Sequence, residues 1–190
     1  MKYDIVLCGV GGQGVLSMAA IIGKAAMLEG LTAKQSEVHG MAQRGGAVSA
    51  HLRLSDLTIA SDLIPRGAAD LILSMEPIEA LRYVAYLSPS GMLVTAVDPY
   101  VNIPDYPPLE GVLTQLRALP NVLLVEAERL AREAGDVLAM NTVMVGAAAH
   151  LLPVGRATLE RVIETTFAAK SDYTLRVNRT AFASGGQVAV

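Results

Sequence analysis

Residues 4–14 read Asp-Ile-Val-Leu-Cys-Gly-Val-Gly-Gly-Gln-Gly, an apolar run that leads directly into a cluster of glycines. A short apolar run that ends at glycine predicts a buried strand over residues 4–10. The next segment, 14–28, is rich in Ala, Leu, Ile and Met and is followed by Gly30, so it predicts a helix. A buried strand, a glycine turn and a helix are a typical opening of an α/β fold.

The rest of the chain continues this alternation of apolar strands and helices. Further strands are predicted over 70–75, 91–97 and 122–125. The proline-rich connection that follows the second of these is expected to be extended, because proline disfavours helical backbone in the residue before it. Predicted helices cover 77–87, 112–119, 127–134, 139–151 and 158–169, and a helical or irregular segment covers 172–183 before a Gly-Gly tail.

The pattern before residue 60 indicates that the sheet is not purely parallel. Residues 47–54 alternate between apolar and polar side chains, as a half-buried strand does. No crossover helix precedes them, so we expect an antiparallel strand at the edge of the sheet. Residues 32–37 are polar and predict a weak strand at most. The expected fold is α/β, with three layers in the order α/β/α around a mostly parallel but mixed sheet, in one domain over residues 1–190.

The composition of the 190-residue chain excludes several classes of protein. Hydrophobic residues make up 52% and charged residues 17%, which favours a packed core over disorder. The formal net charge of -3 argues against a nucleic-acid partner. The longest charge-free stretches, 5–23 and 137–155, are interrupted by glycine or by polar residues and proline, and the first residues do not resemble a signal peptide. We therefore expect no membrane association and a cytoplasmic location.

The cysteine and the histidines limit the redox and metal chemistry of the chain. Cys8 is the single cysteine, so the chain has neither an internal disulfide nor an iron–sulfur cluster held by its own thiolates. Its apolar surroundings predict a core thiol rather than a nucleophile. His39, His51 and His150 are widely spaced, which predicts no metal site. His39 is the candidate general acid or base because of its loop position, and a hydrogen bond within the loop is the simpler role.

The glycine cluster Gly9–Gly14 fits the pattern G-x-G-x-x-G between a strand and a helix. Glycines permit close backbone approach, and a helix N-terminus favours an anion, so a phosphate site is expected here. A nicotinamide dinucleotide site also needs an acidic residue about 20 positions further on, at the end of a parallel strand. Glu37 is the candidate, but the segment 32–36 is too polar for a central parallel strand, and a solvated loop acid is the simpler role. The remaining alternative is that the glycines only turn the chain.

A second glycine cluster reads His39-Gly-Met-Ala-Gln-Arg-Gly-Gly46. The guanidinium of Arg44 offers a planar fork that matches phosphate or carboxylate. The adjacent Gly45 and Gly46 allow backbone N–H groups to face an anion as well. Taken alone, a single arginine near glycines is usually a solvated loop residue.

Together the two clusters resemble the gamma-type subunit of 2-oxoacid:ferredoxin oxidoreductases. The His-Gly-Met sequence that begins at His39 favours the indolepyruvate branch of this family, in which the matching chain is the beta subunit. Ala42 departs from the pattern, because the branch often has Ser at this position. Further matches extend the resemblance over nearly the whole chain, at Met140-Asn141-Thr142 with Gly146 and at Asn178–Phe182 with Gly185.

The resemblance implies oxidative decarboxylation of a 2-oxoacid with coenzyme A, giving an acyl-CoA, carbon dioxide and reduced ferredoxin. It places thiamine diphosphate, magnesium and the iron–sulfur clusters on a larger alpha subunit, so this chain is expected to be inactive alone. It also implies that the chain completes the active site and the access of coenzyme A, and that part of its apolar surface faces another subunit. The residues implied in anion or cofactor contact are Gly11, Gly12, Gln13, Gly14, Arg44, Gly45 and Gly46. A purely structural subunit without a ligand is the alternative.

Two asparagines in the late matching segments are expected to be structural. Asn141 lies in an apolar predicted helix, and a buried amide costs free energy unless it is hydrogen-bonded. We therefore expect Asn141 to hold a neighbouring loop and Asn178 to do the same near the C-terminus.

Overall fold

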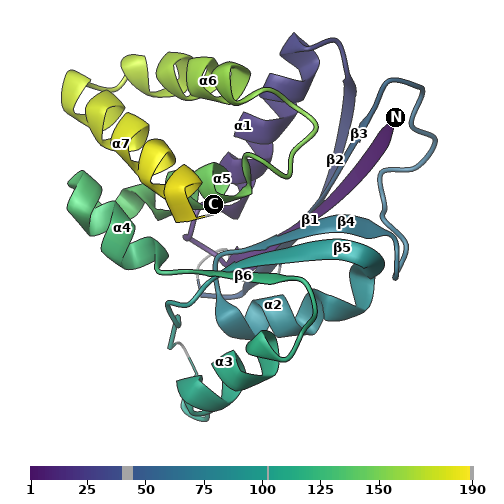
Figure 1. Cartoon of the computed structure of the whole chain (residues 1–190), viewed down its shortest axis with the longest axis vertical. Coiled ribbons are helices and arrows are strands. Elements are labelled where there is room, and N and C mark those ends of the chain that lie inside the picture. The colour runs from purple at the N-terminus through teal and green to yellow at the C-terminus, as the bar shows by residue number, and fades with distance from the viewer. Residues whose placement is uncertain (40–44, 102, 189–190) are drawn as a thin grey trace.

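The computed structural model describes residues 1–39, 45–101 and 103–188. Within them, six strands form one sheet in the order β2-β3-β1-β4-β5-β6 (Figure 1). The strands are β1 (Lys2–Val10), β2 (Thr32–His39), β3 (Ala47–Ser55), β4 (Ala69–Ser74), β5 (Leu87–Ala96) and β6 (Val122–Val125). The pairs β1–β4, β4–β5 and β5–β6 are parallel, whereas β1–β3 and β2–β3 are antiparallel. The predicted α/β class with a mixed, mostly parallel sheet is confirmed.

Helices cover both faces of this sheet. Figure 1 shows α2 and α3 on one face, and α1 with α4 to α7 on the other. The α-helices are α1 (Val15–Leu28), α2 (Pro77–Tyr83), α3 (Leu109–Arg117), α4 (Ala127–Ala134), α5 (Met140–Ala148), α6 (Arg156–Ala168) and α7 (Asp172–Val188). Two short 3-10 helices, η1 (Val84–Tyr86) and η2 (Val137–Ala139), follow α2 and precede α5.

The central strand β1 is buried on both faces because its side chains alternate between two apolar cores. Ile5 and Leu7 belong to the core under α1, α5 and α7. Val6 and Cys8 belong to the core under α2 and α3. A strand covered by helices on both sides needs apolar side chains on both faces. The sequence of β1 therefore shows a continuous apolar run rather than an alternation of apolar and polar residues.

The first two antiparallel strands differ from the prediction. The segment expected to be a weak strand forms β2, which pairs with β3 over its full length of eight residues. β2 takes the edge position, so β3 lies between β2 and β1 and is not the edge strand that we expected. An edge strand faces solvent along one side and tolerates polar and charged residues, which is why its sequence looked unlike a strand.

The last helix extends further than predicted. Helix α7 continues to Val188 and includes the Gly-Gly pair that the sequence indicated as a tail. Its Gly185 lies against α5, since a Cβ atom built there would stand 2.0 Å from the Val143 carbonyl oxygen. Gly146 of α5 has the matching contact, 2.2 Å from the carbonyl oxygen of Phe182. The glycines therefore allow α5 and α7 to cross with their backbones in contact.

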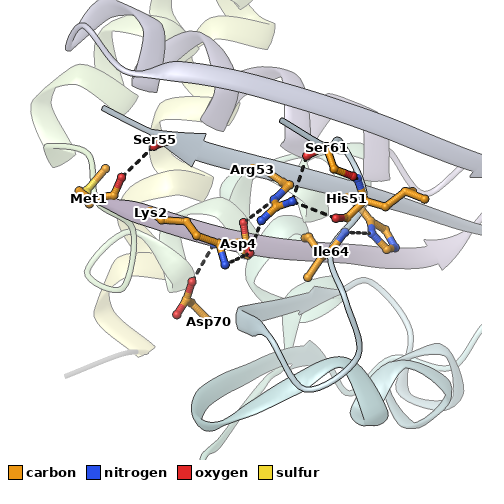
Figure 2. Close-up of polar contacts among 10 residues, drawn as sticks. Met1, Lys2, Asp4, His51, Arg53, Ser55, Ser61, Ile64 and Asp70 are labelled. Atoms are coloured by element: carbon orange, nitrogen blue, oxygen red, sulfur yellow. Dashed lines mark hydrogen bonds and ion pairs between the residues drawn. The ribbon is translucent and has the colours of Figure 1, made fainter. Parts of the chain in front are cut away.

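The N-terminal end of β1 is held by a buried ion pair (Figure 2). The Asp4 side chain is fully buried, and its carboxylate accepts the Arg53 Nε at 2.9 Å and lies 2.8 Å from the Lys2 ammonium. The Asp4 backbone N–H donates to the Asp70 carboxylate at 2.8 Å. These contacts compensate the charge of Asp4, as a buried carboxylate requires.

The same network fastens the loop that follows β3. The Arg53 guanidinium donates to the carbonyl oxygens of Ser61 and Leu63, at 2.9 and 3.0 Å (Figure 2). His51 Nδ1 accepts the Ile64 backbone N–H at 3.0 Å. Burial first, and then the Arg53 charge, lower the pKa of His51, which keeps this nitrogen available as an acceptor. His51 therefore has a structural role in the middle of β3, where it pairs with Val6 of β1 and holds the loop at Ile64.

Candidate functional site

The first glycine cluster forms a tight turn where β1 ends and α1 begins. Gly12 and Gly14 have φ angles of +106° and +86°, in the left-handed region that favours glycine. The side chain of Gln13 braces the turn, because its Oε1 accepts the Val10 N–H at 2.7 Å and its Nε2 donates to the Met75 carbonyl at 3.2 Å. The turn is thus fixed to both β1 and the end of β4.

The turn also uses some of its own N–H groups. Gln13 N–H donates to the Val10 carbonyl at 3.1 Å, and Gly11 N–H donates to the Gly46 carbonyl at 2.8 Å. Within the described residues, the N–H groups of Gly12 and Gly14 have no such acceptor. Of the four residues predicted to contact phosphate through their backbone, Gly12 and Gly14 are therefore the ones with N–H groups available for a ligand.

The end of the second glycine cluster, Gly45 and Gly46, lies against the first cluster although the two are about 30 positions apart in the sequence. Antiparallel pairing of β1 with β3 places Val10 opposite Ala47, and this brings Gly46 next to Gly11. The Gly45 N–H donates to the Gly11 carbonyl at 3.2 Å, which together with the Gly11–Gly46 bond closes the junction. The contact of Gly45 and Gly46 with Gly11 is a condition for the two clusters to form one site, and the site itself stays a prediction.

Two predicted site residues lie partly or wholly outside the described structure. Arg44 is outside the described residues. His39 is the last residue of β2 and pairs with Val48, while its side chain is outside the described part. Their chemical roles stay predictions.

A hollow of about 390 Å³ opens over the turn and the first turn of α1. The N-cap Gly14 contributes no side-chain hydrogen bond, and the first helical turn contains no acidic residue. The exposed N–H groups and the positive end of the helix dipole therefore favour an anion here. The hollow is lined by Val10, Gly11, Gly12, Gly14, Val15, Leu16, Ser17 and Val48.

The buried amide of Asn141 packs behind this turn. A Cβ atom built on Gly14 would stand 2.9 Å from Asn141 Nδ2, so Asn141 limits the space at Gly14. Its Oδ1 accepts the N–H of Thr142 at 2.9 Å, and the Thr142 hydroxyl donates to Asn178 Oδ1 at 2.6 Å. Asn178 Nδ2 in turn donates to the Thr174 carbonyl at 2.9 Å. The Thr142–Asn178 hydrogen bond thus links α5 to α7, and Asn141 supports the loop by packing.

A cluster of acidic and phenolic groups beside the turn was missed by the sequence reasoning. Glu76 follows β4 and is 1% exposed, and its Oε2 accepts the Glu79 N–H at 2.9 Å as the N-cap of α2. Its Oε1 accepts the hydroxyl of Tyr106 and the N–H of Tyr100. The Glu-Pro pair at the start of a predicted helix was the available signal for the cap, whereas nothing in the sequence pointed to Tyr106.

Burial controls the ionisation of the groups around β1 and α2. Burial, with smaller effects of Glu79 and Glu76, raises the pKa of the Cys8 thiol to about 12 despite a hydrogen bond with Ser74. Burial also raises the pKa of Glu79, against the opposing effect of Arg82. Cys8 is therefore a core thiol, as predicted, and an unsuitable nucleophile or metal ligand.

A comparison with protein families identifies the chain. The family described as "Pyruvate ferredoxin/flavodoxin oxidoreductase" matches residues 4–188. The chain belongs to this family. Membership of the pyruvate ferredoxin/flavodoxin oxidoreductase family confirms the resemblance carried by the two glycine clusters and by the late asparagine and glycine segments.

Individual relatives agree with this assignment. The chain is 40% identical over 179 residues to the indolepyruvate oxidoreductase subunit IorB of Archaeoglobus fulgidus, covering 90% of this chain and 88% of the relative. It is 33% identical over 151 residues to the 2-oxoglutarate synthase subunit KorC of Methanothermobacter marburgensis, covering 77% and 76%. The keto/oxoacid ferredoxin oxidoreductase gamma subunit of Geobacter sulfurreducens has the same fold, with a TM-score of 0.73, 24% identity and 98% coverage of both chains.

The described residues contain neither a membrane-spanning helix nor a metal-binding group. None of their helices is both long and apolar enough to cross a membrane. No three His, Cys, Asp or Glu side chains among them form a group that could hold a metal ion. A cluster with thiolate ligands also does not fit the sequence, because Cys8 is the single cysteine and is buried.

Proposed function

We propose that this chain is a subunit of an indolepyruvate-type 2-oxoacid:ferredoxin oxidoreductase in the cytoplasm. The observation that carries the proposal is the junction of the two glycine clusters, in a chain that is 40% identical to an indolepyruvate oxidoreductase subunit over nine-tenths of its length. The complex would decarboxylate a 2-oxoacid oxidatively with coenzyme A and pass the electrons to ferredoxin. The redox and thiamine chemistry would belong to a large alpha subunit.

The content of the chain supports this division of labour. An iron–sulfur cluster needs about four thiolate ligands, whereas the chain has one cysteine, and the described residues contain no group of three His, Cys, Asp or Glu side chains that could hold a metal ion. What the chain offers instead is a rigid hollow with N–H groups at a helix N-terminus. Its proposed role is therefore to complete the active site and to bind coenzyme A rather than to react with the oxoacid.

In this proposal, the hollow binds a phosphate group of coenzyme A. The N–H groups of Gly12 and Gly14 and the N-terminus of α1 face the anion, and the Gln13 side chain keeps the turn in this shape. Gly45 and Gly46 are hydrogen-bonded to Gly11 of the first cluster, and Arg44 directly precedes them in the sequence. An arginine there adds charge-assisted hydrogen bonds to phosphate.

Purification from native extract tests the proposed assembly. The tagged chain at its native expression level should retain a large protein that contains thiamine diphosphate and iron–sulfur clusters. Recovery of the chain alone, or with a partner that lacks both cofactors, contradicts the proposed function.

Replacing Arg44 tests the proposed anion contact. In the assembled enzyme, Arg44→Ala should raise the Michaelis constant for coenzyme A by about tenfold, because one charge-assisted hydrogen bond contributes about 1.5 kcal/mol or more. The constant for the oxoacid should change little. Arg66→Ala, at an exposed arginine near the opposite end of the sheet, is the matched control and should leave both constants unchanged. If the Michaelis constant for coenzyme A were the same in the Arg44→Ala and Arg66→Ala enzymes, Arg44 would not contact coenzyme A.

The topology disfavours the nicotinamide alternative. A dinucleotide site needs an acidic residue at the end of a parallel strand beside β1, but β2 is antiparallel and separated from β1 by β3. Glu37 is exposed on that edge strand, and its carboxylate accepts the Gln35 side-chain amide at 2.6 Å. Calorimetry should therefore detect no submicromolar binding of oxidised or reduced nicotinamide nucleotides.

The other alternative is a structural subunit without a ligand. This alternative predicts that coenzyme A does not change the midpoint of thermal unfolding, either in the natural assembled complex or in a Gly12→Ala complex. The proposed function predicts that coenzyme A raises the midpoint in the natural complex and raises it less in a Gly12→Ala complex.

A further inference from the structure

A small acidic pocket is lined by Gly45 of the second glycine cluster and shares Val10 with the hollow over the first cluster. Its volume is about 140 Å³, far below the several hundred Å³ of a pocket for a nucleotide. A single side-chain head group is the size of ligand that it fits. The acidic pocket is lined by Val10, Gly45, Ala47, Glu76, Ile78, Glu79, Arg82, Tyr100, Ile103 and Tyr106.

One of its two carboxylates is fully satisfied by the protein. Glu76 accepts hydrogen bonds from the Glu79 N–H, the Tyr106 hydroxyl and the Tyr100 N–H. The three donors leave the Glu76 carboxylate hydrogen-bonded within the chain, as a buried polar group requires.

The other carboxylate lacks a hydrogen-bond donor. The side chain of Glu79 is 7% exposed, and its Oε1 lies 3.5 Å from the Nε of Arg82. Its Oε2 is buried and accepts no hydrogen bond from the described residues. A buried carboxylate oxygen without a donor is unfavourable, so the pocket is completed by a group that brings N–H donors and positive charge.

The mouth of the acidic pocket has an apolar rim. Tyr100 and Ile103, which line the pocket, are 41% and 40% exposed, and Val101 between them in the sequence is 69% exposed. Valine and isoleucine are usually buried. A desolvated charged group surrounded by exposed apolar side chains is typical of the centre of a protein–protein interface. An exposed tyrosine ring also stacks well on a guanidinium plane.

We propose that the acidic pocket receives a basic side chain, with arginine the best fit, from another subunit of the complex. The guanidinium donates to Glu79 Oε2 and lies close to the Glu76 carboxylate, while its aliphatic stem packs against Tyr100 and Ile103. The existence of another subunit rests on the proposed function, whereas the pocket rests on the contacts seen within this chain. The contact thereby anchors the partner next to the coenzyme A hollow.

A probe of the head group tests the pocket on the full chain. Nuclear magnetic resonance titration with ethylguanidinium chloride should shift the backbone signals of Glu79, Tyr100 and Tyr106 and reach saturation, whereas sodium chloride at equal ionic strength should not. Glu79→Gln should weaken this binding by at least about tenfold, since it removes a charge-assisted hydrogen bond. Glu133→Gln, at an exposed glutamate of α4, is the matched control and should not change it. Absence of saturation, or equal binding by Glu79→Gln, overturns the proposal.

Cross-linking in the purified complex identifies the source of the basic group. A benzophenone amino acid in place of Ile103, at the rim, leaves Glu76 and Glu79 intact and so also serves if Glu79→Gln does not fold. The expected product joins Ile103's position to a peptide of another subunit with an arginine or lysine near the attachment point. Attachment to a peptide without a basic residue, or within this chain alone, overturns the proposal. Failure of the proposed function can be told apart from failure of the pocket proposal, because the cross-linked partner would then lack thiamine diphosphate and iron–sulfur clusters.

Discussion

Cys8 lies on the central strand between apolar side chains, and its side chain is fully buried. Because burial raises the pKa of the thiol to about 12, almost no thiolate forms at pH 8. We expect the native chain not to react with iodoacetamide at this pH, and to react with one equivalent per chain after unfolding in urea. Mass spectrometry counts the alkylated sites. Rapid modification of the folded chain would show that β1 opens to solvent.

The raised pKa of Glu79 predicts how the stability of the folded chain depends on pH. Burial raises its pKa in the folded state above the ordinary value, so the folded chain binds this proton more tightly than the unfolded chain does. The free energy of unfolding should therefore decrease as pH rises from the ordinary pKa of Glu79 through the raised one, and then level off. Urea unfolding at a series of pH values measures this.

Glu79→Gln isolates the effect of this single group. The variant cannot ionise, so its stability relative to the natural chain should be lowest in acid and should increase over the same pH range. A constant difference between the two proteins across the range would show that Glu79 does not titrate with a raised pKa.

At the scale of elements, the crossing of α5 and α7 depends on contact between their backbones. Gly185→Ala would bring a methyl group to 2.0 Å from the Val143 carbonyl oxygen, so the helices must separate. We expect a loss of about 3 kcal/mol in the free energy of unfolding, at the upper end of overpacking costs. Gly111→Ala in α3 is the matched control, since nothing lies within 4 Å of the added Cβ. It should stabilise the chain by about 0.5–1 kcal/mol. If Gly185→Ala and Gly111→Ala changed the free energy of unfolding equally, the backbone contact between α5 and α7 would be contradicted.

The edge strand β2 shows where prediction of single elements fails. Lys34, Gln35 and Glu37 argue against a strand when read alone, because most strands have one apolar face. Their position is determined by β3, which pairs with β2 along its whole length and with β1 on its other side. The polar sequence was a sign of an edge strand, and only the sheet order reveals that β2 occupies that edge.

At the scale of the whole molecule, the two ends of the sheet have separate tasks. The Asp4–Arg53 pair holds one end, and Gly45 and Gly46 meet the first glycine cluster at the other. Arg53→Met should lower the free energy of unfolding by about 3 kcal/mol, because it leaves a buried carboxylate whose remaining counter-ion among the described residues is Lys2. Coenzyme A affinity of the assembled enzyme, measured by calorimetry, should change little.

An exposed ion pair provides the control for this prediction. Lys34 lies 4.0 Å from Asp62 with both side chains largely exposed, so Lys34→Met should change the free energy of unfolding by about 0.5 kcal/mol or less. If Arg53→Met cost no more than Lys34→Met, the network in Figure 2 would not stabilise the fold.

Only the part of the site whose residues are neighbours in the sequence could be predicted. Gly11–Gly14 could be recognised because a strand, a turn and a helix follow one another directly. The adjacency of Gly45 and Gly46 followed from the family resemblance rather than from a physical argument, since strand pairing cannot be read from single segments. Glu76 and Tyr106 are separated by 30 residues and a proline-rich connection, and no periodicity joins them. The acidic pocket was therefore outside the reach of sequence reasoning.

The contact between α5 and α7 also determines how this region can evolve. At Gly146 and Gly185, the obstructing atom is a carbonyl oxygen of the opposite helix, which every amino acid possesses. A larger residue at either position therefore has no compensating substitution at Val143 or Phe182. Each glycine is retained independently, and the pair should show no covariation among descendants, unlike two side chains that fill a shared space.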